Sequence, residues 1–210
     1  MLKQSSAPKK MQSKIGSILA VIPLSPNQWT VLSLIAAIVA AIMIGLGNLV
    51  PGLILFALAG ALDMVDGAVA RARGEVSDLG GFIDGVSDRF VEALFLFSFM
   101  FYPLPTIFID PKIWLASLIF LGTCMPSFIR AYADHKKVIT HEEALALGGF
   151  FERGERIILI VLGLMFGLVW GMQFFVAYII AASVFSLVTI IQRLAAIIYP
   201  KSPGIPPTRT

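Results

Sequence analysis

Four aspartates stand in or beside apolar helical sequence, where an ionised carboxylate is costly. They are Asp63, Asp66, Asp84 and Asp88. A helix advances about 100° per residue, so Asp63 and Asp66 share one helix face. Asp84 and Asp88, four residues apart, share a face of the next helix. A carboxylate within a membrane span costs about 2.5 to 3.5 kcal/mol unless another group compensates it. These acids are therefore the first candidates for function.

A divalent cation is the natural compensation for such a cluster of carboxylates. Oxygen ligands suit Mg²⁺, Mn²⁺ or Ca²⁺ better than zinc. Gly67 and Gly80 on the same helix faces leave space beside a metal, and Arg71 is placed to pair with a phosphate. Together these features predict a diphosphate site. The alternative is structural: helix-end ion pairs with Arg71, Arg73 and Arg89, and glycines that serve helix packing.

The rest of the chain must form membrane helices that position these groups. A hydrophobic content of 58%, a charged content of 14% and a mean hydropathy of +0.88 exclude a soluble globular protein. Since a span needs about 20 apolar residues, the sequence predicts an all-α integral membrane protein with six transmembrane helices. They are expected at 28–49, 50–70, 80–104, 112–133, 156–171 and 173–199.

Basic residues are concentrated on one side of this topology. The N-terminal tail, the link after Arg71, the loop after Asp134 and the C-terminus share that side, and Lys112 is the basic residue on the other. The positive-inside rule therefore predicts cytoplasmic termini, with the acids at the cytoplasmic rim. The apolar stretch within 11–24 is too short to cross a bilayer and predicts an interfacial helix. We interpret the chain as one membrane domain, 1–210, made of a tail and interfacial helix (1–25), six helices (26–199) and a cytoplasmic tail (200–210).

The composition also excludes several other classes of site. Cys124 is the single cysteine, which excludes a disulfide framework and a cysteine metal site. The sequence pI of 9.1 does not indicate a nucleic-acid partner, because the distribution of Lys and Arg follows the membrane topology.

The aspartate motif resembles the signature of the CDP-alcohol phosphotransferases. It reads Asp63-x2-Asp66-Gly67-x2-Ala70-Arg71-x8-Gly80-x3-Asp84-x3-Asp88, with every specified position present. The resemblance implies an enzyme of phospholipid biosynthesis that transfers a phosphatidyl-type group from a CDP-activated lipid to an alcohol and releases CMP. It also implies a site for two Mg²⁺ ions, with Mn²⁺ as a possible substitute, and a homodimer.

The same resemblance assigns roles to individual positions. Asp63, Asp66 and Asp84 would be metal ligands, and Asp88 would contact the metal and serve as general base. The CDP-lipid would be bound by Asn27, Thr30, Gly67, Ala70, Arg71, Ser77 and Gly80. Of these, Asn27 and Thr30 come from the segment Pro26 to Thr30, which resembles a Pro-x-x-x-Thr start of the first helix. An ordinary helix start signal explains that short segment equally well.

A second segment, Gly148 to Arg156, indicates which alcohol is the acceptor. It resembles the Gly-x-x-Glu-Arg-x-Glu-Arg region of phosphatidylinositol phosphate synthases and their archaetidyl counterparts. The resemblance implies CDP-diacylglycerol or CDP-archaeol as donor and inositol 1-phosphate as acceptor. Arg130, Arg153 and Arg193 would form the acceptor pocket, because guanidinium groups bind a dianionic phosphate well.

Other functions remain open at the level of sequence. Glycerol 3-phosphate is the next acceptor, and serine follows, although serine has no phosphate for the arginines to bind. Membrane prenyltransferases also combine acidic helices, Mg²⁺ and a lipid diphosphate, but they need more helices and do not require glycines at these spacings. A divalent cation transporter would place its acids near the bilayer midplane, and transporter halves are usually repeated, which these are not.

Overall fold

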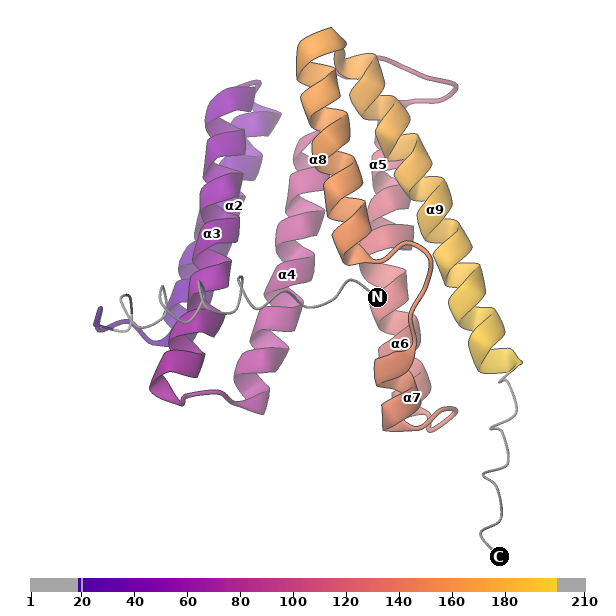
Figure 1. The fold of residues 1–210 in the computed structure, drawn as a ribbon. Helices are drawn as coiled ribbons and strands as arrows, with labels where there is room; N and C mark the ends of the chain where they lie inside the picture. Colours follow the sequence, from indigo (N-terminus) through magenta and orange to yellow (C-terminus); the bar gives the residue numbers. More distant parts are fainter. Residues whose placement is uncertain (1–18, 20, 200–210) are drawn as a thin grey trace, which may run out of the picture. The chain divides into compact units, whose positions relative to one another are not determined.

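The structure is a computed structural model that describes residues 19 and 21–199. Over these residues it is helical, apart from one isolated bridge between Ile107 and Ile109, which confirms the all-α prediction. The chain divides into two compact units, Met1–Pro103 and Leu104–Thr210. Figure 1 labels the helices along the chain. Most of the predicted interfacial helix at 11–24, and the tail at 200–210, lie outside the described residues.

The described residues of unit 1 form three long helices. They are α2 (Pro26–Gly45), α3 (Leu49–Arg73) and α4 (Asp78–Ser98). Short links join them, and Gly47 (φ 87°) and Gly74 (φ 69°) supply left-handed backbone at the two turns. Helix α2 packs against both α3 and α4. Within this unit α2 is therefore next to both helices that carry the four aspartates.

Small residues allow α2 and α3 to approach closely. A Cβ on Gly52 of α3 would lie 2.5 Å from Cγ1 of Ile44 on α2, so only glycine fits there. Ala37 and Ala40 on α2 are fully buried. A hydroxyl bond adds to the contact, since Ser33 Oγ donates to the Ala59 carbonyl oxygen at 2.8 Å. Such small-residue contacts are typical of membrane helix pairs.

Unit 2 begins with one continuous helical segment of changing pitch. It consists of α5 (Pro111–Leu118), the π-helical turn η1 (Ile119–Cys124) and α6 (Met125–His135). Pro126 has no N–H to donate to the preceding turn, and such a missing bond is a common cause of irregular pitch. The short helix α7 (His141–Ala146) follows, in a stretch where the sequence predicts a polar loop.

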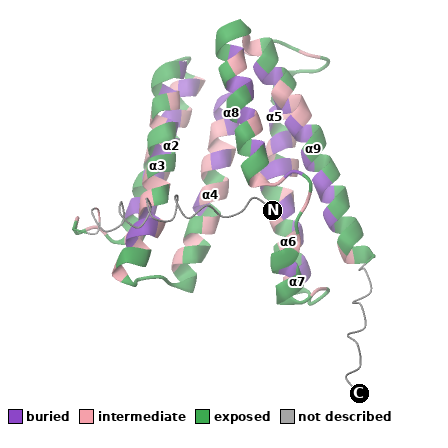
Figure 2. Cartoon of the chain, viewed as in Figure 1, coloured by how far each residue is buried: buried purple, intermediate pink, exposed green. Residues whose placement is uncertain are grey.

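Two further helices follow in the described part of unit 2. They are α8 (Arg153–Trp170) and α9 (Met172–Ile198), joined at Gly171 with φ 114°. A Cβ on Gly163 would lie 2.4 Å from Tyr178 Cβ, so this glycine allows α8 and α9 to pack closely. The buried residues of α9 recur every three or four positions along one face, as the coloured bands in Figure 2 show. That face includes the polar residues Thr189 and Arg193.

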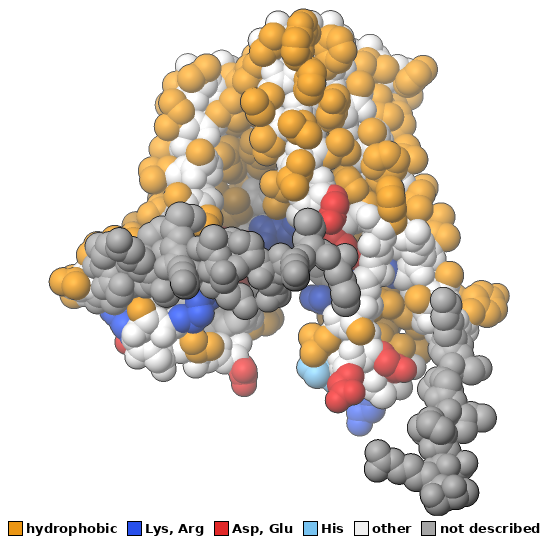
Figure 3. Space-filling model, viewed as in Figure 1, with side chains coloured by type: hydrophobic (Ala, Val, Ile, Leu, Met, Phe, Trp, Pro, Cys, Tyr) orange, Lys and Arg blue, Asp and Glu red, His pale blue; other side chains and the backbone are white. Residues whose placement is uncertain are grey.

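The described helices fit a membrane protein. Four segments are long and apolar enough to span a bilayer: Pro26–Gly45, Leu49–Arg73, Pro111–His135 and Met172–Ile198. Figure 3 shows hydrophobic side chains over much of the visible helix surface. Two of the predicted spans correspond to α4, which is rich in charged residues, and to α8, whose first turn is charged. The count of six spans therefore stays a prediction.

Candidate functional site

Three of the predicted metal ligands lie together in unit 1. Asp63, Asp66 and Asp84 each offer a carboxylate oxygen, and these oxygens lie within 4.8 Å of one another. The first two are one turn apart near the end of α3, and Asp84 lies in the second turn of α4. Ser77 begins α4 by accepting a bond from the Gly80 backbone N–H. This short capped link returns the chain so that the two acidic faces meet.

Asp88, one turn further along α4, lies beside this group. It interacts with the side chain of Asp63. Its Oδ2 is also 3.4 Å from Nη1 of Arg89. Asp88 is therefore part of the acidic cluster, with a neighbouring cation on its own helix.

Asp66 is buried, with 4% of its surface exposed. The Thr30 hydroxyl on α2 donates to Asp66 Oδ2 at 2.5 Å, and the Gly67 backbone N–H donates to Oδ1. Thr30 Oγ1 also lies 3.3 Å from the Pro26 carbonyl oxygen. These bonds orient the carboxylate, as partners of metal ligands typically do. Thr30, predicted to bind the CDP-lipid, thus directly contacts a predicted metal ligand.

The donor set suits a hard divalent cation. All the clustered ligands are carboxylates, the type of oxygen donor preferred by Mg²⁺ and Mn²⁺. Asp63 Oδ1 is buried and has no hydrogen-bond partner among the described residues. A buried acceptor of this kind is costly unless something binds it. The residues therefore fit a divalent metal ion.

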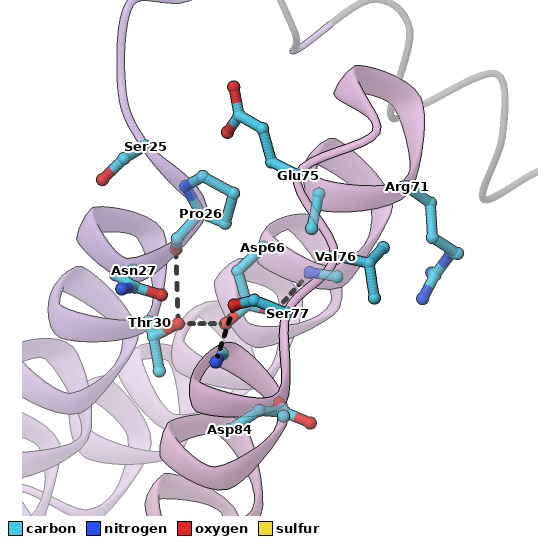
Figure 4. Close-up of a pocket in the computed structure, with 14 residues that line it drawn as sticks. Ser25, Pro26, Asn27, Thr30, Asp66, Arg71, Glu75, Val76, Ser77 and Asp84 are labelled. Atoms are coloured by element: carbon cyan, nitrogen blue, oxygen red, sulfur yellow. Dashed lines mark hydrogen bonds between the residues drawn. The ribbon is translucent and has the colours of Figure 1, made fainter.

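A cavity of about 440 Å³ opens beside the acids in unit 1. It brings together every residue predicted to bind the CDP-lipid, with two of the metal ligands: Asn27, Thr30, Asp66, Gly67, Ala70, Arg71, Ser77, Gly80 and Asp84. Figure 4 shows Thr30, Asp66 and Asp84 bordering this space from three different helices. A Cβ on Gly67 would lie 3.2 Å from Arg71 Nη1, so glycine keeps this part of the cavity open.

Five lining residues were not among the predicted binding residues. They are Ser25, Pro26, Glu75, Val76 and Gly81. Each lies within two residues of a predicted position, so proximity along the chain was the available signal. Glu75 is notable because it adds a carboxylate to a cavity that also contains Arg71.

In unit 2, Arg193 is the predicted acceptor residue with the best defined contacts. It is buried, with 4% of its surface exposed. Nη1 donates to the Pro126 carbonyl oxygen at 2.5 Å, and Nη2 donates to both carboxylate oxygens of Glu152, at 2.8 and 2.7 Å. Its buried Nε has no hydrogen-bond partner among the described residues.

These contacts join the three helices that carry the predicted acceptor residues. Pro126 is in α6 with Arg130, Glu152 is the N-cap of α8 and precedes Arg153, and Arg193 is in α9. The helices therefore converge. The sequence alone does not predict Glu152 as a partner of Arg193.

The loop before α8 is bonded to the same face of α9. The backbone N–H of Phe150 donates to Gln192 Oε1 at 2.8 Å, and that of Phe151 donates to Thr189 Oγ1 at 3.0 Å. A Cβ on Gly149 would lie 2.3 Å from Thr189 Cγ2, so the loop needs glycine at this close approach. One turn of α9 thus holds both the loop and Glu152.

Comparisons with known proteins identify the family of the chain. The sequence profile of the CDP-alcohol phosphatidyltransferase family matches residues 23–192, which include all the predicted site residues except Arg193. The archaetidylinositol phosphate synthase of Pyrococcus horikoshii is 33% identical over 89% of this chain and 90% of its own. The phosphatidylinositol phosphate synthase of Mycobacteroides abscessus is 30% identical over 90% of this chain and 84% of its own.

Solved structures share the fold. The phosphatidylinositol phosphate synthase of Mycobacterium tuberculosis with CDP-DAG bound superposes with a TM-score of 0.73 at 22% identity, covering 93% of this chain and all of that chain (100%). The same enzyme in complex with manganese and citrate gives a TM-score of 0.71 at 23% identity, covering 92% of this chain and 90% of that one. With the family profile and the sequence relatives, these findings show that the chain belongs to the CDP-alcohol phosphatidyltransferase family and is a transferase.

Proposed function

We propose that this enzyme transfers a phosphatidyl or archaetidyl group from a CDP-activated lipid to a hydroxyl of inositol 1-phosphate and releases CMP. The observation that carries the proposal is the meeting of Asp63, Asp66 and Asp84 beside a cavity lined by the rest of the signature. The choice of acceptor is supported by relatives named archaetidylinositol phosphate synthase and phosphatidylinositol phosphate synthase.

In this proposal the four aspartates hold two Mg²⁺ ions, which Mn²⁺ can replace. Bound there, the ions would neutralise the charge of the diphosphate and of the departing CMP. Asp66 is kept in place for this role by Thr30 on α2. The second ion rests on the family resemblance, and the carboxylate count is sufficient for it.

The residues of the chain then have distinct tasks. Asp88 takes the proton from the acceptor hydroxyl, whose oxygen attacks the lipid-side phosphorus in line. A new oxygen–phosphorus bond forms as the bond to CMP breaks, and CMP leaves with that electron pair. Arg71 pairs with a phosphate oxygen, while Gly67 and Gly80 leave room for the nucleotide.

The acceptor phosphate binds in unit 2 to Arg130, Arg153 and Arg193. The buried Nε of Arg193, which finds no hydrogen-bond partner in the described part of the chain, supports this assignment, because a buried guanidinium N–H is expected to have a partner when its site is filled. The family resemblance and the convergence of α6, α8 and α9 support it further.

We extend the proposal to the membrane arrangement. Residues 1–210 form one membrane domain with six spans. Four spans are the apolar segments described above, and α4 and α8 are the other two. Both termini are cytoplasmic, and the active site lies at the cytoplasmic rim, where water-soluble acceptors arrive while lipid tails stay in the bilayer. The enzyme forms a homodimer. The distribution of Lys and Arg supports this orientation.

A panel of acceptors tests the proposal. The purified enzyme is given CDP-diacylglycerol or CDP-archaeol, Mg²⁺, and one of inositol 1-phosphate, glycerol 3-phosphate, serine or free inositol. We expect CMP release with inositol 1-phosphate to exceed release with each other acceptor. Faster release with glycerol 3-phosphate would replace the proposed acceptor, and metal flux into liposomes without CMP release would replace the enzyme by a transporter.

Removing the Thr30 hydroxyl should weaken metal binding. We expect Thr30→Val to raise the Mg²⁺ concentration for half-maximal CMP release about tenfold, since losing a bond that orients a metal ligand typically costs 10- to 100-fold in affinity. Ser33→Ala is the matched control, because Ser33 lies on the same helix but donates to the Ala59 carbonyl. An unchanged Mg²⁺ requirement for Thr30→Val would contradict the metal assignment of Asp66.

Truncating Arg193 should affect one substrate much more than the other. We expect Arg193→Ala to raise the KM for inositol 1-phosphate by about 10- to 100-fold, because bonds to charged groups contribute about 1.5 to 3 kcal/mol. The KM for the CDP-lipid should change less than about threefold. Lys136→Ala, at an exposed lysine of unit 2, serves as control. A larger change in the CDP-lipid KM than in the acceptor KM would overturn the pocket assignment.

A further inference from the structure

The segment that leads into α2 forms one wall of the cavity in unit 1. This lead-in segment, Ile22–Ser25, continues into Pro26 and Asn27, and its last residue lines the cavity with them. It comes before α2 and is outside that helix, with one internal backbone bond from Leu24 N to the Ile22 carbonyl at 2.8 Å. Its position must therefore be fixed by contacts with other elements.

Arg73, the last residue of α3, supplies such a contact. Its Nη1 donates to the Leu24 carbonyl oxygen at 2.8 Å and its Nη2 to the Ile22 carbonyl oxygen at 2.5 Å. A guanidinium can bond two carbonyls at once because its N–H groups form a rigid fork, whereas a lysine ammonium is a point donor. Arg73 is two positions after Arg71, about 200° around the helix, so the two side chains lie on opposite faces.

The lead-in segment is stiff, so one anchor can orient it. Pro23 and Pro26 fix their own φ angles and restrict the residues before them to extended backbone. Ser25 is accordingly extended, with φ −70° and ψ 156°, and its side chain caps α2 through a bond from Gln28 N. A stiff segment bonded to α3 at one end and capped onto α2 at the other transmits the position of Arg73 to the cavity wall.

We propose that Arg73 is a positioning residue of the CDP-lipid pocket: by bonding two carbonyls of the lead-in segment it fixes the wall formed by Ser25, Pro26 and Asn27. Arg73 thereby sets the affinity for the nucleotide part of the CDP-lipid without lining the cavity itself. This inference rests on the proposed function, because it takes the cavity as the CDP-lipid site.

The experiment compares steady-state CMP release by the wild type, Arg73→Met and Arg73→Lys. We expect Arg73→Met to raise the KM for the CDP-lipid about tenfold, with kcat and the acceptor KM within about twofold. Arg73→Lys keeps the charge but not the forked N–H donors, so its CDP-lipid KM should lie between those of the wild type and Arg73→Met. Full recovery in Arg73→Lys would show that charge alone matters and would overturn the inference. Lys136→Met is the control for loss of a surface cation.

A double substitution tests whether Arg73 acts through the wall. In an Asn27→Ala background, Arg73→Met should raise the CDP-lipid KM by less than about threefold, because coupled residues are non-additive. A tenfold increase of the CDP-lipid KM in the Asn27→Ala background would mean that Arg73 does not act through the cavity wall. Amide hydrogen exchange at Leu24 and Gln28 gives a readout independent of turnover, and it should speed up in Arg73→Met.

The outcomes separate the two proposals. A wild-type enzyme that releases no CMP from any CDP-lipid would overturn the proposed function. An active wild type whose Arg73→Met variant keeps the same CDP-lipid KM and the same amide exchange would overturn only the role of Arg73.

Discussion

Replacing Asp88 by asparagine is expected to lower kcat for CMP release by about 10³-fold, within the range of 10² to 10⁴ typical of a lost general base. The amide cannot accept the proton of the acceptor hydroxyl, although it keeps the size of the side chain. The KM for the CDP-lipid should change little, because the cavity beside Asp66, Gly67 and Arg71 stays intact. The measurement is steady-state CMP release with both substrates varied.

Asp88 is also predicted to contact the metal, so the two roles must be separated. Raising the Mg²⁺ concentration should restore activity if the substitution only weakens metal binding, and should not restore it if the proton acceptor is lost. Asp78→Asn is the matched control, since Asp78 is a carboxylate in the first turn of the same helix. Turnover of Asp88→Asn close to that of the wild type would remove Asp88 from the base role.

The aspartate cluster was predictable because every step in the prediction is local. Asp63 and Asp66 share a face by helix periodicity, as do Asp84 and Asp88, and the link between the helices is too short to separate those faces. The helices themselves follow from long apolar runs, and the described ones begin and end within a few residues of the predictions. One difference is α4, which ends at Ser98 rather than near 104.

Contacts between distant parts of the chain were not predictable in the same way. Thr30 and Asp66 are 36 positions apart, and their bond depends on how closely α2 and α3 pack. That distance is set by Gly52 and the buried alanines of α2, whose effect appears only once the two helices are paired. Sequence resemblance placed Thr30 near the nucleotide, whereas the structure also shows its bond to Asp66.

The same reason explains why the partner of Arg193 was missed. Glu152 and Arg193 are 41 positions apart, and the sequence predicts Arg193 as a member of the acceptor pocket but gives no partner for it. Pro126 accepts a bond from Arg193 through its carbonyl oxygen, and the position of that oxygen depends on the irregular helical pitch of η1. The sequence shows which side chains are charged, but tertiary packing determines which of them pair.

Removing the carboxylate of Glu152 is expected to destabilise the protein markedly. Arg193 has a side chain that is 5% exposed, and Glu152→Ala would leave its guanidinium buried, with the Pro126 carbonyl oxygen as its remaining hydrogen-bond partner among the described residues. Breaking a fully buried ion pair costs about 3 to 5 kcal/mol. Because the Glu152 side chain is 40% exposed, water can compensate partly, and we expect about 2 kcal/mol. For a chain of this size that lowers Tm by about 4 to 8 °C, measured by thermal unfolding in detergent.

Two further variants show whether the buried charge is the cause. Glu155→Ala removes a carboxylate from the same helix start, where Glu155 accepts a bond from Glu152 N at 3.1 Å, and should lower Tm by less than about 3 °C. Glu152→Ala combined with Arg193→Met should have a higher Tm than Glu152→Ala alone, because no unpaired buried charge remains. If the double variant is instead less stable than Glu152→Ala, then Arg193 stabilises the convergence of α6, α8 and α9 mainly through its other contacts. In that case the ion pair with Glu152 is not what allows the Arg193 guanidinium to be buried.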